Sequence, residues 1–211
     1  MRIHQITVLR DQRRIQMTVE MPDLSRYLTS QVPNLPRQLF RVLPSMAKHT
    51  CHNDNGVSFR KECRSTEIPH LFEHIVLELQ GQSQDMYVLR GETRWNWHET
   101  PRGYFTVSVD YDNELLVIAA IKLAERIVQS LDDHSIDALD MPVEIARLRE
   151  IARIGRELDI PTWVFSAGNR SGVADAQTAC PRLVQTLRRR ATGRRAVPPA
   201  THARRLAAQP R

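Results

Sequence analysis

The amino-acid sequence predicts an α+β fold: a single domain over residues 1–160 in which antiparallel strands pack with amphipathic helices. Segments of alternating polarity and segments of helical periodicity follow one another in the order ββα–α–ββ–αα, which favours antiparallel hairpins over βαβ units. After Pro161 the periodicity fades. Residues 161–211 are therefore expected to form a linker and a disordered, arginine-rich tail.

Four segments are expected to be strands. They are Arg2–Leu9, Arg14–Glu20, Met86–Leu89 and Tyr104–Tyr111. The first two flank the polar segment Arg10–Arg13, and apolar residues alternate cleanly with polar ones in the second of them. This arrangement predicts a hairpin.

Four further segments have the periodicity of helices. They are Leu35–Met46, Thr66–Gln80, Asn113–Leu131 and Pro142–Leu158. Pro44 is expected to cut the first helix short, because proline cannot continue a helix. In the second, Thr66 is the expected N-cap and Gly81 the expected stop signal.

The positive charge of the chain belongs to its tail. The sequence has 30 basic and 24 acidic residues, a formal net charge of +6. Residues 181–211 contain nine arginines and no acidic residue, so the preceding body is slightly negative, at −3. Such a tail can meet nucleic acid or another anionic partner, but a solvated, disordered end is the simpler interpretation. The body shows no nucleic-acid recognition motif.

Composition also bounds the cellular context. No apolar run approaches the length of a membrane span and no signal peptide is recognisable, so we expect a cytoplasmic protein without membrane contact. Three cysteines, at 51, 63 and 180, lack C-x-x-C spacing and fit reduced thiols. An alternative is a zinc knuckle built from His49, Cys51, His52 and Cys63.

The segment Thr66–Gln80, TEIPHLFEHIVLELQ, carries the candidate active site. His70 and His74 lie one helical turn apart, within about 40° of each other around the axis, so both imidazoles can bind one metal ion. Glu73 lies between them and can reach a metal-activated water. This H-x-x-E-H order is that of the inverted zinc peptidases. The pattern is short, and a helix with two surface histidines and one glutamate is the alternative.

Several segments, in the same order, resemble the N-terminal domain of cyanophycin synthetases, which assemble a polymer with an aspartate backbone and arginine branches. The segments that carry the resemblance are Ile6-Thr7-Val8-Leu9-Arg10, Leu43-Pro44-Ser45-Met46 with His49-x-Cys51, His70 through Gln80, Gly91-Glu92-Thr93-Arg94, Gly103-Tyr104 and Asn113-Glu114. The resemblance covers roughly residues 1–155, and H-x-x-E-H-x-x-L-E-L-Q is its most specific part.

The chain departs from these synthetases in two respects. It has neither the ATP-grasp domain nor the Mur-ligase-like domain, so we expect that it is not a synthetase on its own. Pro69 stands where family members usually have glycine, and Lys61–Ser65 replaces a glycine-rich approach to the motif.

The resemblance implies a hydrolytic activity, present in some family members, that cuts the polymer into shorter chains. His70 and His74 then become ligands of zinc or another divalent metal, and Glu73 becomes the general base. Neutral imidazoles leave the metal electrophilic enough to activate water, and a nearby carboxylate takes the proton.

A catalytic zinc site normally has three protein ligands, so one more is required. Glu114, at the start of the alanine-rich helix and matched in the family, is the expected third ligand, with Asp110 and Glu150 as reserves. The alternative for Glu114 is a carboxylate placed in the first turn of a helix by the helix dipole.

Three other residues are expected to support the site. Glu78 lies eight residues, or about 12 Å, along the helix from His70, which suits a residue that orients a ligand imidazole better than a ligand itself. Arg94 and Tyr104 are candidates for substrate binding, although a surface position explains Arg94 equally well.

Two functions remain open at this point. The first is a metal-dependent hydrolase acting on cyanophycin or a related Asp/Arg polymer, and the intact histidines and glutamate favour it. The second is a non-catalytic module that binds the polymer or a separate synthetase and keeps a vestigial site. The lack of synthetase domains favours this module. Nucleic-acid binding through the tail is a weaker third, and a homo-oligomer is compatible with each.

Overall fold

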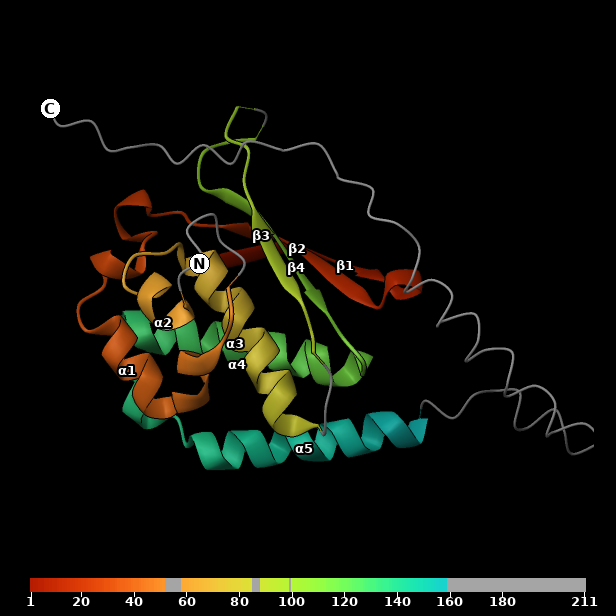
Figure 1. The fold of residues 1–211 in the computed structure, drawn as a ribbon. Coiled ribbons are helices and arrows are strands. Elements are labelled where there is room, and N and C mark those ends of the chain that lie inside the picture. Colours follow the sequence, from red (N-terminus) through yellow and green to blue (C-terminus); the bar gives the residue numbers. More distant parts are fainter. Residues whose placement is uncertain (52–57, 85–87, 99, 159–211) are drawn as a thin grey trace, which may run out of the picture. The chain divides into compact units, whose positions relative to one another are not determined.

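The computed structural model describes residues 1–51, 58–84, 88–98 and 100–158. These residues belong to one compact unit, Met1–Ile160, and confirm the α+β class with five α-helices and one four-stranded antiparallel sheet (Figure 1). The predicted disordered tail lies outside the described residues.

The sheet has the strand order β1–β2–β4–β3, with antiparallel pairing throughout. Its strands are β1 (Arg2–Leu9), β2 (Arg14–Glu20), β3 (Gly91–Arg94) and β4 (Tyr104–Asp110). β1 and β2 form the predicted hairpin, whereas β4 lies inside the sheet. The strand expected at Met86–Leu89 is wrong in position: Val88 and Leu89 are not in a strand, 86 and 87 lie outside the described residues, and pairing with β4 begins at Gly91.

The helices lie on one side of the sheet, so alternate residues of each strand have different surroundings (Figure 1). On the inner face, Phe105, Val107 and Val109 of β4 pack into the core with the alternate apolar residues of β2. Tyr104 and Thr106 of β4 lie on the outer face. Arg94 lies on the same face because it pairs with Thr106.

The five helices are α1 (Leu35–Val42), α2 (Phe59–Glu62), α3 (Ile68–Ser83), α4 (Glu114–Asp132) and α5 (Met141–Leu158). α3 is central and contacts α4, α5, β3 and β4. It begins at Ile68 with Glu67 as N-cap, and it continues through Gly81 to Ser83. Its packing against other elements on several sides sustains the helix past the expected stop signal. No helix in the described part of the chain is both long and apolar enough to cross a membrane.

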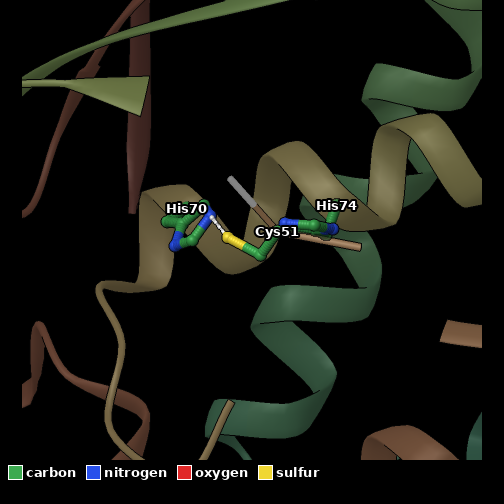
Figure 2. Close-up of side chains that lie close together, drawn as sticks. All are labelled: Cys51, His70 and His74. Carbon is green, nitrogen blue, oxygen red and sulfur yellow. Dashed lines mark hydrogen bonds between the residues drawn. The ribbon is translucent and has the colours of Figure 1, made fainter. Parts of the chain in front are cut away.

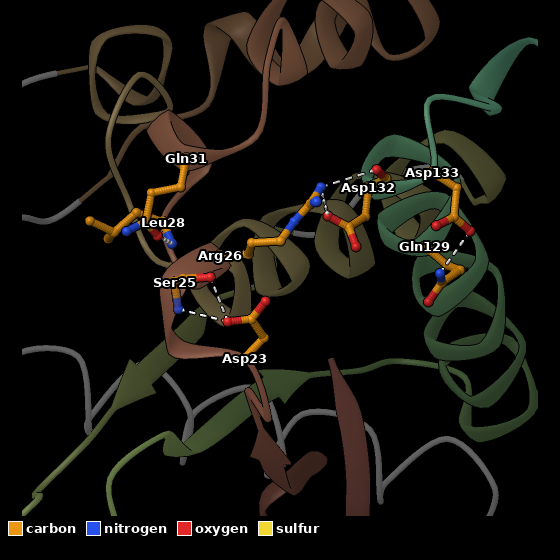
Figure 3. A network of polar contacts seen from close by, with 8 residues as sticks. All are labelled: Asp23, Ser25, Arg26, Leu28, Gln31, Gln129, Asp132 and Asp133. Atoms are coloured by element: carbon orange, nitrogen blue, oxygen red, sulfur yellow. Dashed lines mark hydrogen bonds and ion pairs between the residues drawn. The ribbon is translucent and has the colours of Figure 1, made fainter.

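The segment before α1 fixes the N-terminus of α3. Backbone hydrogen bonds join Thr29 N to Thr66 O at 2.8 Å and Ile68 N to Tyr27 O at 2.7 Å. Arg26, in the same segment, donates to the Asp132 carboxylate at 2.6 Å and so ties this segment to the end of α4 (Figure 3). The first turn of α3 is therefore held between two other parts of the fold.

Asn113 joins the start of α4 to α5. Its side-chain oxygen accepts a hydrogen bond from Leu116 N at 3.0 Å, and its amide donates to Ala152 O at 3.1 Å. A Cβ atom on Gly155 would lie 2.2 Å from the Asn113 amide nitrogen. Glycine at 155 therefore permits the close approach on which this N-cap depends.

We expect Gly155→Ala to lower the free energy of unfolding by about 1–3 kcal/mol, because the new methyl group displaces the N-cap of α4. Gly81→Ala is the matched control, since a Cβ there meets nothing within 4 Å. It should raise the same quantity by about 0.5–1 kcal/mol through helix propensity. Urea denaturation measures both, and a Gly155→Ala protein as stable as wild type would contradict this account of the packing.

Candidate metal and hydrolytic site

α3 is an unusual helix because it buries polar side chains together with its apolar ones. Leu71, Phe72 and Ile75 are fully buried, and the polar residues His74 and Glu73 are each only 4% exposed. Burial of a polar or charged group costs free energy unless it is paired. The partners of these side chains therefore define the site.

Cys51 joins His70 and His74 in the group of described residues that has the geometry of a metal site. One ligand atom from each lies within 4.8 Å of the others, and Cys51 Sγ lies 3.4 Å from His70 Nε2 (Figure 2). For comparison, a thiolate and an imidazole on one tetrahedral zinc ion lie about 3.5 Å apart. Sulfur and imidazole nitrogen are both ligands that zinc accepts.

The Nδ1 atom of each histidine has a hydrogen-bond partner. His70 Nδ1 lies 2.8 Å from Thr66 Oγ1, and His74 Nδ1 lies 3.1 Å from His49 Nδ1. Burial lowers the pKa of His70 to about 4. Burial, followed by the nearby His70 and His49, lowers the pKa of His74 to about 2. Both imidazoles are thus neutral near pH 7, the form that can bind a metal ion.

Glu73 faces the sheet. Its Oε2 accepts a hydrogen bond from Thr93 Oγ1 of β3 at 2.6 Å, and a Cβ on Gly91 would lie 2.4 Å from Oε1. Burial raises the pKa of the Glu73 carboxyl to about 7, while the Thr93 hydroxyl opposes this shift. The carboxylate thus lies on the β3 side of α3, and a glycine in β3 provides the space for it.

Glu78 is linked to the histidine pair through one further residue. Its Oε2 lies 2.6 Å from His49 Nε2, and its Oε1 accepts hydrogen bonds from Ser45 Oγ and Gln82 Nε2. Burial alone would raise the pKa of Glu78, but the hydrogen bonds from His49, Ser45 and Gln82 outweigh it and lower that pKa. Glu78 is thus an ionised acceptor, and His49 stands between it and His74.

The structure does not bring Glu114 to the histidines. Its carboxylate pairs with Arg10 at 3.0 Å, at the start of α4. Gln80 Nε2 donates to Asp110 O at 3.2 Å, which places the end of β4 beside the C-terminal part of α3. Ten helical residues, about 15 Å, separate Gln80 from His70. Among the described residues, Cys51 and not Glu114 completes the group that could hold a metal ion with the two histidines.

The two reserve ligands also have other partners. The Asp110 carboxylate pairs with Arg14 at 2.7 Å, and Glu150 pairs with Arg153 at 2.7 Å on the surface of α5. Neither carboxylate belongs to the group formed by Cys51 and the two histidines.

Arg94 and Tyr104 lie on the outer face of the sheet, whereas α3 packs on the inner face. Arg94 pairs with its neighbour Glu92, and Tyr104 stacks on His4 with ring centroids 5.5 Å apart. Their expected role in binding substrate beside the histidines has no support in this arrangement.

The residues that the sequence alone did not assign to this site are Thr66, Gly91 and Thr93; His49 and Cys51 entered only through the zinc-knuckle alternative. The other thiol of that alternative, Cys63, is fully buried in the core, which raises its pKa to about 12. His52 lies outside the described residues. The signal for the missed residues was present in the segments His49-x-Cys51 and Gly91-Glu92-Thr93-Arg94, whose partners no spacing rule identifies.

Fold and site together define an α+β domain in which a buried H-x-x-E-H helix combines with a cysteine from a neighbouring segment. The family profile described as the cyanophycin synthase-like N-terminal domain matches residues 14–133, more than half of the chain. The chain belongs to this family, which confirms the resemblance seen in the sequence.

Two cyanophycin synthetases are similar to this chain. The protein from Synechocystis sp. (strain ATCC 27184 / PCC 6803 / Kazusa) is 31% identical over 143 residues, which cover 66% of this chain and 16% of the relative. The protein from Geminocystis herdmanii (strain PCC 6308) is 32% identical over 124 residues, which cover 58% and 14% respectively. The chain thus spans about one sixth of the length of these relatives.

The raised pKa of Glu73 predicts a specific pH dependence of stability in the metal-free protein. Because its folded pKa of about 7 lies above the ordinary value of 4.5, the folded state binds more protons than the unfolded state between those two pKa values. The contribution of Glu73 to stability is therefore present at low pH and is lost as the pH rises through 7. Relative to wild type, Glu73→Gln should gain about 2–3 kcal/mol in free energy of unfolding between pH 5 and pH 8.

Chemical denaturation in the presence of a chelator, at several pH values, measures this difference. Exposed Glu150 supplies the control, because Glu150→Gln should follow the wild-type profile over the same range. Parallel profiles for wild type and Glu73→Gln would show that the carboxylate is not held in a buried position.

Proposed function

We propose that this chain is a metal-dependent hydrolase that cleaves peptide bonds in cyanophycin or a related Asp/Arg polymer. The observation that carries the proposal is the group formed by Cys51, His70 and His74, with Glu73 one residue from a ligand on the same buried helix. Three protein ligands with a remaining position for water or substrate are typical of catalytic zinc sites.

The residues present fit zinc. The donor set contains one sulfur and two neutral imidazoles, and both Nδ1 atoms have hydrogen-bond partners, which leaves the Nε2 atoms for a metal. When bound, the metal supplies Lewis-acid chemistry, which lowers the pKa of water and polarises a carbonyl group.

In this proposal Glu73 is the general base. A base works best when its pKa is close to the operating pH, and burial raises the pKa of Glu73 to about 7. Thr93 holds the carboxylate through its hydroxyl, and the surrounding apolar residues of α3 exclude bulk water from the proton that it takes up.

The substrate class is suggested by the relatives. The relatives are named cyanophycin synthetases and are much longer proteins. This chain corresponds to about one sixth of their length. We infer that a cytoplasmic domain of this family acts on the same kind of polymer, either beside a separate synthetase or in its absence.

One observation favours the alternative of a non-catalytic, polymer-binding module. Glu73 is engaged by Thr93 on the sheet side of α3, and its hydrogen bond there competes with a role as base. In that case the site would bind metal for structural reasons only, and the polymer would bind elsewhere on the domain.

The metal ligands can be tested separately from activity. We expect wild type to bind about one equivalent of zinc, and Cys51→Ser and His74→Ala to weaken binding by at least about tenfold, because each removes a donor atom. Glu114→Gln is the matched control and should bind zinc as wild type does, since its carboxylate pairs with Arg10. Competition with a chromogenic chelator gives the affinities. Normal binding by Cys51→Ser together with weak binding by Glu114→Gln would reassign the third ligand to Glu114.

The catalytic role of Glu73 is tested by Glu73→Gln, which keeps the shape and the hydrogen bond from Thr93. This variant should bind zinc normally and lose polymer cleavage by about 10²–10⁴-fold, the usual contribution of a positioned proton acceptor. Shortening of an Asp/Arg polymer, followed by mass spectrometry with zinc or with chelator, is the assay. Undiminished cleavage by Glu73→Gln, or cleavage that resists the chelator, would overturn the mechanism. A wild type that binds the polymer without cutting it would support the binding module.

A further inference from the structure

A chain of hydrogen bonds runs from Glu78 through His49 to His74. Glu78 Oε2 lies 2.6 Å from His49 Nε2, and His49 Nδ1 lies 3.1 Å from His74 Nδ1. His49 belongs to neither α3 nor the H-x-x-E-H motif, and it follows the 3-10 turn Pro44–Lys48. The partly buried His49 side chain thus connects a buried carboxylate to a candidate metal ligand.

The direction of each hydrogen bond follows from the chemistry of the first residue. An ionised carboxylate can only accept hydrogen bonds, so the proton between Glu78 and His49 must be on His49 Nε2. A neutral imidazole with its proton on Nε2 has a lone pair on Nδ1. When His49 is neutral, its Nδ1 is the acceptor, and His74 Nδ1 carries the proton between the two rings.

This direction of the hydrogen bond between the two rings fixes the tautomer of His74. With its proton on Nδ1, the neutral ring has its lone pair on Nε2, the nitrogen required to bind a metal beside Cys51 and His70. In Figure 2 the His74 ring directs one nitrogen toward Cys51 and keeps the other on the opposite side. The opposite tautomer would place a proton on Nε2 and block the ligand.

The Glu78 carboxylate, the first member of this series of hydrogen bonds, is held in place by two further donors. Ser45 Oγ and Gln82 Nε2 both donate to Glu78 Oε1, which leaves Oε2 directed at His49. Ser45 lies in the 3-10 turn before His49, and Gln82 lies one helical turn after Glu78. The orientation of Glu78 thus does not depend on His49 alone.

We propose that His49 and Glu78 are positioning residues that fix the tautomer and the ring orientation of His74 for metal binding. This inference rests on the proposed metal site but not on hydrolysis. Partners of this kind typically change metal affinity by about 10–100-fold when they are removed.

The tautomers can be measured directly in the metal-free protein, without any substitution. Nitrogen-15 NMR of the histidine rings distinguishes a proton on Nδ1 from a proton on Nε2. We expect His49 to carry its proton on Nε2 and His74 to carry its proton on Nδ1. A predominant Nε2 proton on His74 would overturn the proposal whether or not the protein binds zinc.

Two substitutions at 49 separate positioning from packing. His49→Leu fills the space but offers no acceptor, so His74 should populate both tautomers and zinc affinity should fall by about 10–100-fold. The amide oxygen of His49→Asn can replace Nδ1 as acceptor, so this variant should keep the His74 tautomer and lose no more than about tenfold in affinity. Equal zinc affinity in wild type and His49→Leu would refute the role of His49.

Glu78→Leu should shift the His74 tautomer in the same direction as His49→Leu. His4→Leu is the matched control, because His4 forms an equivalent 2.6 Å contact with Glu20 at the sheet, where no candidate ligand lies. The His4→Leu variant should leave the His74 tautomer and the zinc affinity unchanged. Zinc binding without polymer cleavage would refute the hydrolase alone, whereas no zinc binding by wild type would overturn this proposal together with the metal site.

Discussion

The need to pair the buried polar side chains of α3 dominates this structure. A central helix surrounded by other elements would ordinarily be apolar on every side, yet α3 buries a histidine and two glutamates in contact with the core. Each of the three has a partner outside α3. Glu73 pairs with Thr93 in β3, and His74 and Glu78 both pair with His49. The positions of β3 and of the segment before α2 are thus tied to the polar groups of one helix.

The fold could be predicted from the sequence to a large extent because hydrophobic periodicity reports which residues are buried. The β1–β2 hairpin, β4, α4 and α5 lie where the alternating and helical patterns place them. β3 was missed because it is a four-residue edge strand with two charged residues. Its sequence therefore lacks the alternation of apolar and polar residues that marks a half-buried strand. The ends of α3 were displaced because tertiary contacts at Thr66, and at Gln80 and Gln82 on either side of Gly81, override local start and stop signals.

The site could be predicted only where it is local in sequence. The one-turn spacing of His70 and His74 correctly places the two rings together, with centroids 4.9 Å apart. Because consecutive residues of a helix are rotated by about 100° around its axis, Glu73 points in a different direction from His74. Only the position of β3 determines that the Glu73 direction faces the sheet. Alternation in β3 then sends Gly91 and Thr93 inward to Glu73 and Arg94 outward. The segment that suggested a substrate-binding arginine serves the carboxylate instead.

The strand order has a consequence for synthesis of the chain on the ribosome. β2 pairs with β4, and the Arg14–Asp110 contact at this pairing closes a loop of 96 residues. Until β4 has emerged, the β1–β2 hairpin keeps an open edge of unpaired backbone groups, and the inner face of the sheet has no β4 beneath α3. The nascent polypeptide therefore carries an exposed template for strand addition while residues 21–103 are synthesised. Insertion of β4 between two earlier strands closes that template.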